Sequence, residues 1–183
     1  ATASPVQHVL DEVAALCSRR NVRIALENLP YPGQPEFLSS LLENYPPDFV
    51  GVCYDSGHGN LLPGGLDWLR RHKSRVLSLH LNDNRGQKDD HDPPFEGTVP
   101  WDTLAEILAR SSYQNCQGLQ CHANYESFEK PLCLECTMPR STMSRKKTKD
   151  EPGFLSRCFE GVRRLDGMVK SHRENRSAGE DGD

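Results

Sequence analysis

Apolar and polar positions follow a repeating order along the chain, beginning with a helical pattern. Apolar side chains recur three and four residues apart across residues 6–17, directly after Ser4 and Pro5. A serine followed by a proline is typical of a helix N-terminus, so we predict a helix that ends near residues 19–21. The mostly apolar run at residues 22–28 has the length of a buried strand.

This order of helix and strand is repeated, which predicts parallel strands joined by crossover helices and therefore an α/β fold. The strand after the fourth helix is less well defined than the others. A last amphipathic helix follows residues 152–153, and residues 171–183 carry almost no apolar side chain, so we expect one domain over residues 1–170 and a disordered polar tail. The pattern places the further helices at residues 36–44, 66–72 and 101–110 and the further strands at residues 49–55 and 76–81.

Composition and charge narrow the class of protein. The 183 residues suffice for one compact core, although a closed (β/α)8 barrel needs about 200 or more. No window approaches the roughly 18 apolar residues of a membrane span, so no membrane partner is expected. The net charge of −4 argues against nucleic acid as a partner, and seven cysteines fit a reduced, cytoplasmic setting better than a disulfide framework.

Three predicted strands end in polar side chains, Glu27, Asp55 and His80. In parallel α/β folds, ligands bind at the carboxyl ends of the strands, so chemistry is expected there. Because side chains alternate along a strand, the residues two positions earlier lie on the same face. These three residues are all small, whereas their neighbours on the other face of the strands are bulky. The small residues are Ala25, Cys53 and Ser78.

The chemistry of these side chains points to a metal site. Glutamate, aspartate and histidine together suit Mn, Mg, Zn or Co. A fourth ligand should come from the next strand, for which Glu135 and His122 are the candidates. We prefer Glu135, because the small Cys133 stands two residues before it, whereas the longer Gln120 precedes His122. This choice implies a connection of about twenty residues, 111–130, which is long for such folds.

Five segments, in this order and spacing, resemble the xylose isomerase-like TIM-barrel superfamily of sugar phosphate isomerases and epimerases, to which endonuclease IV is related. They are ALENLP, VGVCYDSGHGNL, VLSLHLNDN, HDPPFEGTVPWDTL and PLCLE, and the likeness covers roughly residues 5–170. It implies the C-terminal half of a TIM barrel, strands five to eight. Because members of the superfamily begin with four more strands, we expect a chain truncated at its N-terminus, or a half-barrel completed by another chain, such as a homo-oligomer.

The resemblance also implies a function in carbohydrate metabolism. It assigns one divalent ion (Mn, Zn, Mg or Co) to Glu27, Asp55, His80 and Glu135, and a sugar or sugar phosphate as substrate. Glu27 and Glu135 would move a proton through a cis-enediolate, and His58 would hold a substrate oxygen. Four more residues are expected to orient these groups or to contact the substrate: Asn28, Asp83, Asp89 and His91.

One alternative is a phosphodiesterase like endonuclease IV, acting on abasic DNA. Its relatives share the D-x-x-H pattern of Asp55 and His58 and the D-x-H pattern of Asp89 and His91. The negative net charge and residues 95–101 favour the epimerases instead. A non-catalytic, truncated scaffold is a further alternative.

Two other patterns could be binding sites, one for zinc and one for phosphate, but a purely structural role is preferred for both. The cysteine pairs 116/121 and 133/136 could hold a structural zinc, but residues three apart on a strand face opposite sides, which disfavours the chelate. The basic run within residues 140–149 follows the last strand, where barrels often bind phosphate. It contains no glycine-rich turn, so a solvated loop is preferred.

Overall fold

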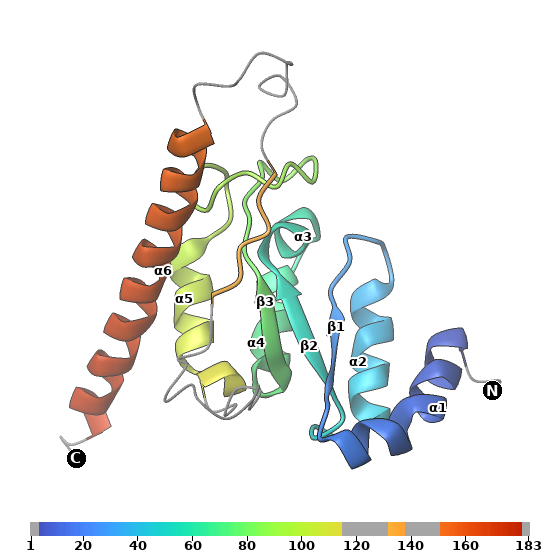
Figure 1. Ribbon diagram of the computed structural model, residues 1–183. Helices are drawn as coiled ribbons and strands as arrows, with labels where there is room; N and C mark the ends of the chain where they lie inside the picture. Colours follow the sequence, from blue (N-terminus) through green and yellow to red (C-terminus); the bar gives the residue numbers. More distant parts are fainter. Residues whose placement is uncertain (1–3, 115–131, 138–150, 181–183) are drawn as a thin grey trace.

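The computed structural model describes residues 4–114, 132–137 and 151–180 (Figure 1). Helices and strands alternate, as the apolar pattern predicts, and the three strands form a parallel sheet in the order β1-β2-β3. Within these ranges, no helix combines the length and apolar character that crossing a bilayer requires. The elements are α1 (Pro5–Arg20), β1 (Ile24–Glu27), α2 (Gln34–Asn44), β2 (Val50–Asp55), α3 (Ser56–Leu61), α4 (Gly65–His72), η1 (Lys73–Arg75), β3 (Val76–His80), α5 (Trp101–Ala109), η2 (Ser112–Gln114) and α6 (Glu151–Glu180).

Local sequence explains where α1 begins and ends. The Ser4 hydroxyl accepts a hydrogen bond from the Gln7 amide at 3.3 Å, and the Gln7 side chain accepts one from the Ser4 amide at 2.8 Å. This reciprocal cap precedes Pro5, whose fixed φ suits the first helical turn. Asn21 ends the helix in the left-handed conformation, with φ of 51°.

The sheet places the carboxyl ends of its strands at one edge. In the register of β1 and β2, Glu27 lies opposite Cys53, and in that of β2 and β3, Asp55 lies opposite His80. The central strand β2 is buried along its whole length. The predicted strands are confirmed, each a little shorter than its apolar run.

The fourth strand exists as a single parallel bridge beside β3. Leu81 donates to the Cys133 carbonyl at 2.8 Å, and Glu135 donates to the Leu81 carbonyl at 3.1 Å. Residues 132–137 therefore occupy the place expected for this strand. The described part of the chain forms an open sheet and not a closed barrel, and the predicted truncation stays a prediction.

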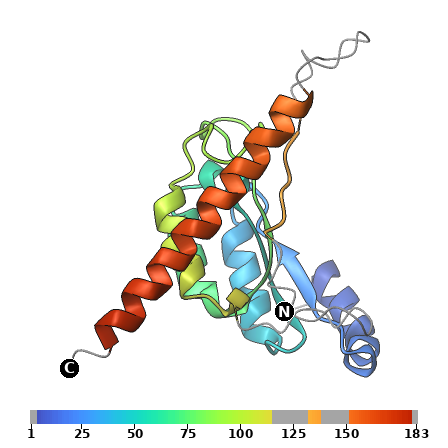
Figure 2. The same ribbon diagram turned by 60° about the vertical axis from the view of Figure 1, so that its left-hand side comes forward.

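Helices cover the sheet, and α6 packs along α5 (Figures 1 and 2). The core lies between the helices and the face of the sheet that bears Val52, Tyr54 and Leu79. Fully buried members of this core include Leu41, Leu69, Leu79, Leu104, Leu108 and Leu165.

The end of the chain differs from the sequence expectation. The sequence predicts a disordered tail over residues 171–183, but α6 continues to Glu180. Extending an existing helix adds a hydrogen bond for each residue ordered, so a polar segment can continue a helix that is already packed through Leu165 and Val169. His172 also reaches Asp102 at the start of α5, at 3.3 Å. The predicted domain boundary at residue 170 therefore falls inside α6.

Candidate metal centre

The ends of the strands bring together Glu27, Asp55, His80 and Glu135, the four residues that the sequence analysis selected as metal ligands. Each offers one nitrogen or carboxylate oxygen, and these four atoms all lie within 4.8 Å of one another. Glu27, Asp55 and His80 are the last residues of β1, β2 and β3, and Glu135 follows the bridge at Leu134. Parallel pairing alone therefore assembles the cluster. Its role as a metal site remains a prediction.

The cluster fits a divalent cation. His80 Nδ1 lies 2.7 Å from Glu135 Oε2 and 3.6 Å from Glu27 Oε1. The first distance is short, yet the two atoms lack hydrogen-bond geometry, and each is a buried atom with no hydrogen-bond partner in the described ranges. Converging acceptors of this kind are stabilised by a cation. Three carboxylates and one imidazole form a donor set that suits Mn, Co, Zn or Mg.

Asp55 is the most deeply held of the four. Its side chain is fully buried, its Oδ1 accepts from the His58 backbone amide at 2.7 Å, and its Oδ2 accepts from Asn82 Nδ2 at 2.9 Å. Burial raises the pKa of this carboxyl, although both hydrogen bonds and the His58 ring act in the opposite direction. A cation beside it would favour the ionised form. The side chains of Glu27, His80 and Glu135 are 30%, 30% and 44% exposed, so the cluster is open on one side.

Asn28 acts on Asp55 through the backbone. Its Nδ2 donates to the Asp55 carbonyl at 2.9 Å, and its Oδ1 accepts from the Asp55 amide at 2.7 Å. The side chain thus continues the pairing of β1 with β2 beyond Glu27. These contacts join Asn28 to the backbone of Asp55, and its role in orienting ligands or contacting the substrate stays a prediction.

His58, Asp89 and His91 form a second group of ligand atoms beside the first. His58 Nδ1 lies 3.0 Å from the Asn28 carbonyl oxygen and 3.1 Å from Glu27 Oε1. His91 Nδ1 lies 2.8 Å from the Glu135 carbonyl oxygen. These partners are all acceptors, so Nδ1 carries the proton in both rings.

The Nε2 atoms of both rings meet the same carboxylate oxygen, Asp89 Oδ2, at 3.2 Å from His58 and 3.1 Å from His91. In a neutral ring with a protonated Nδ1, Nε2 presents a lone pair, and a lone pair facing a carboxylate needs a proton or a cation between them. Burial lowers the pKa of His91, but its bond to the Glu135 carbonyl and the Asp89 carboxylate outweigh burial and raise it overall. This group can therefore hold a proton or a second cation.

Asp83 holds the segment that follows β3, and its expected role near the substrate stays a prediction. Its carboxylate is fully buried and accepts four hydrogen bonds, from the backbone amides of Asn84, Val99 and Phe95 and from the indole of Trp101, at 2.8–3.0 Å. These contacts fold the segment between β3 and α5, which carries Asp89 and His91. Asp83 thus shapes the loop, and none of these four hydrogen bonds involves Glu27, Asp55, His80 or Glu135.

Asn82 donates to Asp55 and is not among the residues predicted from the sequence. A signal was present, because Asn82 stands two residues after His80 and so shares its face if the strand continues. Of the other candidates, His122, Cys116, Cys121 and the basic residues of 140–149 lie outside the described residues. Cys133 is exposed and Cys136 half-buried, and burial raises the pKa of the Cys136 thiol, which disfavours it as a zinc ligand.

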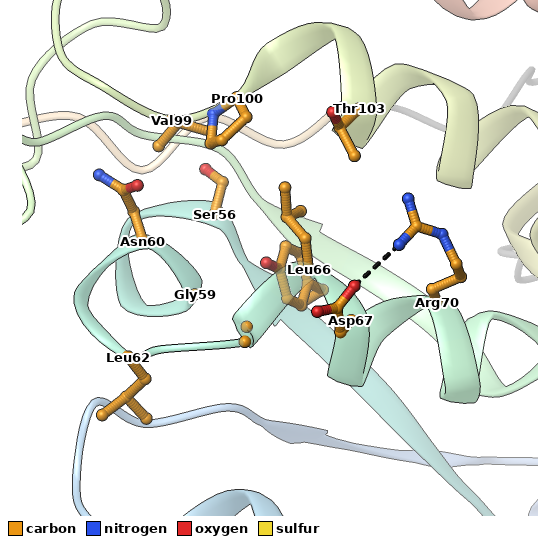
Figure 3. A pocket seen from close by; sticks show the side chains of 13 residues that line it. Ser56, Gly59, Asn60, Leu62, Leu66, Asp67, Arg70, Val99, Pro100 and Thr103 are labelled. Atoms are coloured by element: carbon orange, nitrogen blue, oxygen red, sulfur yellow. Dashed lines mark hydrogen bonds and ion pairs between the residues drawn. The ribbon is translucent and has the colours of Figure 1, made fainter.

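A separate cavity of about 330 Å³ lies between α3, α4 and the start of α5 (Figure 3). Asn60, Leu66, Arg70 and Thr103 are among its lining residues, and Arg70 pairs with Asp67 at 2.9 Å. None of the four clustered ligand residues lines it. The cavity and the candidate metal centre are therefore distinct.

Comparison with known proteins matches residues 5–157 to the xylose isomerase-like TIM barrel. An uncharacterized protein of Sinorhizobium fredii, y4fM, is 36% identical over 174 residues, covering 93% of this chain and 49% of that protein. The uncharacterized protein MJ1311 of Methanocaldococcus jannaschii is 24% identical over 119 residues, covering 61% of this chain and 41% of that protein. The chain thus spans about half the length of these relatives, or less.

A crystal structure described as a D-tagatose 3-epimerase-like protein is similar in fold. The TM-score is 0.53 with 20% sequence identity, and the alignment covers 84% of this chain and 54% of that one. At this level of identity, the likeness concerns the fold alone.

Proposed function

The chain belongs to the xylose isomerase-like TIM-barrel family, and from this premise we propose that it forms the metal-binding part of a divalent-metal-dependent isomerase or epimerase of sugars or sugar phosphates. The observation that carries the proposal is the convergence of Glu27, Asp55, His80 and Glu135 at the ends of parallel strands. The epimerase-like structural neighbour supports the fold on which the proposal rests.

A bound divalent ion would polarise a carbonyl and an adjacent hydroxyl of the sugar, which makes the carbon-bound proton between them more acidic. Glu27 and Glu135 are the two carboxylates suited to exchange that proton, because they come from opposite ends of the row of strands and their side chains are 30% and 44% exposed. Removal by one carboxylate and return by the other inverts a carbon centre or moves the carbonyl through a cis-enediolate. His58 Nδ1, 3.1 Å from Glu27 Oε1, orients that carboxylate.

The proposal predicts solvent exchange into a sugar. With Mn²⁺ present in D2O, the protein should introduce deuterium next to the carbonyl of at least one member of a panel of keto- and aldo-sugars and their phosphates. The Glu27→Gln variant should exchange at least about 100-fold more slowly, because the amide cannot accept the proton. Glu12→Gln, on the exposed face of α1, is the matched control and should keep the parent rate.

Exchange that is equally fast in Glu27→Gln would contradict the assigned role of Glu27. A complete lack of exchange across the panel would contradict the isomerase proposal itself. Such a result would favour either a non-catalytic scaffold or the second candidate function.

The second candidate is a metal-dependent phosphodiesterase acting on abasic DNA, and the His58, Asp89 and His91 group favours it. Two imidazole Nε2 atoms directed at one carboxylate oxygen suit a second cation close to the first. Neighbouring cations can activate a water and stabilise the leaving oxygen of a phosphodiester. This candidate predicts cleavage of a duplex that contains an abasic site, and the isomerase does not. The net charge of −4 makes it the second choice.

A further inference from the structure

Asn82 is fully buried directly after the strand that carries His80. Its backbone is locked to Ser56, because its amide donates to Ser56 Oγ at 3.0 Å and the same hydroxyl donates to the Asn82 carbonyl at 2.6 Å. Ser56 follows Asp55 in the chain. The segment that bears Asn82 and the segment that bears Asp55 are thus joined independently of the Asn82 side chain.

The Asn82 amide is oriented by Asp55. Its Nδ2 donates to Asp55 Oδ2 at 2.9 Å, whereas its Oδ1 is buried without a hydrogen-bond partner in the part of the chain that the structure describes. Turning the amide over would set its oxygen against a carboxylate oxygen. A buried acceptor left unpaired opposes folding. The donor contact to Asp55 therefore determines how this side chain lies.

Gly57 leaves the space in which the amide sits. A Cβ at this position would overlap Asn82 Oδ1. The chain after Asp55 thus lacks a side chain at the point where Asn82 passes. The close approach of the Asn82 side chain therefore explains why a glycine stands at position 57.

We propose that Asn82 is a positioning residue of the metal centre, which fixes the rotation of the Asp55 carboxylate before a cation arrives. The inference rests on the proposed metal-binding function. One carboxylate oxygen is held by the His58 backbone amide, and the other by Asn82 Nδ2, so the plane of the carboxylate is set by two donors from different elements. A ligand oriented in advance loses less freedom when the cation binds.

The test measures the dissociation constant for Mn²⁺ by calorimetry in the full chain. Asn82→Leu keeps the approximate size of the side chain and removes the donor, and it should weaken Mn²⁺ binding by about 10- to 100-fold. Asn84→Ala is the matched control. Asn84 is equally buried and donates to the Gly57 carbonyl at 2.8 Å, but no hydrogen bond joins its side chain to the four clustered residues. Its loss should lower the thermal midpoint while Mn²⁺ affinity stays within about 3-fold.

Two further readouts separate positioning from folding. The visible spectrum of the Co²⁺-loaded protein should change in Asn82→Leu and not in Asn84→Ala. In the parent protein, Mg²⁺ should shift the side-chain amide NMR signals of Asn82 more than those of Asn84, a measurement that needs no variant to fold.

The outcomes distinguish this role from the metal centre itself. A parent that binds Mn²⁺, with Asn82→Leu binding equally well, overturns the role of Asn82 and leaves the metal centre standing. Equal losses of affinity in Asn82→Leu and Asn84→Ala, or Asn82 signals that Mg²⁺ does not move, also overturn it. A parent that binds no divalent ion overturns both proposals.

Discussion

Replacing Asp55 with Asn is expected to weaken Mn²⁺ binding by more than about 100-fold, the largest effect on binding that we predict for a single substitution. Asp55 is the only fully buried member of the cluster, and both of its oxygens already accept hydrogen bonds, from the His58 amide and from Asn82. An asparagine must place its NH2 group against one of these two donors. The substitution therefore removes the charge and also disturbs the position of the remaining oxygen.

Calorimetric titration with Mn²⁺ measures this effect, and the unfolding transition of the metal-free variant shows whether the fold survives. Asp67→Asn is the matched control, because Asp67 is 70% exposed and pairs with Arg70 away from the cluster. This control should bind Mn²⁺ like the parent. An Asp55→Asn variant that folds and retains the parent affinity would refute the assignment of Asp55 as a ligand.

Replacing Asp83 with Ala is expected to lower the free energy of unfolding by about 4 kcal/mol or more. The substitution leaves four donors without their acceptor: the amides of Asn84, Phe95 and Val99 and the indole of Trp101. Each buried donor left unpaired costs about 1–3 kcal/mol, and partial relaxation of the loop reduces the sum. Urea unfolding of the metal-free protein measures the difference.

Asp102→Ala serves as the control for this prediction. Asp102 is 81% exposed and pairs with His172 at 3.3 Å, so its removal should change stability by less than about 0.5 kcal/mol. A loss below about 1 kcal/mol in Asp83→Ala would show that Asp83 does not hold the loop. Because this loop carries Asp89 and His91, the variant should also disturb the second group of ligand atoms.

The sequence predicts the four clustered residues because their positions depend on strand periodicity alone. Small residues at 25, 53 and 78 mark the inner face, and Glu27, Asp55 and His80 continue that face to the strand ends. Parallel pairing then brings them together, and the same alternation favours Glu135, which the structure places beside His80. Local patterns suffice where regular secondary structure positions the side chain.

The segment between β3 and α5 could not be predicted in this way. His91 and Phe95 adopt positive φ angles of 53° and 73°, which residues other than glycine rarely do. These turns bring the amides of Phe95 and Val99 and the indole of Trp101 to Asp83, and they bring His91 to the backbone of Glu135. Contacts of this kind depend on partners far apart in the chain, so no spacing rule separates Asp83 from Asp89. The helical continuation of α6 beyond residue 170 likewise depends on packing that precedes it.

The proposed function requires that Glu27, Asp55, His80 and Glu135 together hold one divalent cation. Elemental analysis of the purified chain, after equilibration with Mn²⁺ and removal of the free ion, measures whether they do. We expect about one Mn²⁺ per chain and none in the Glu27→Gln, Asp55→Asn double variant. Two or more ions in the parent would favour the phosphodiesterase. No bound ion in the parent, or an ion that the double variant retains, would show that these four residues do not form the metal site.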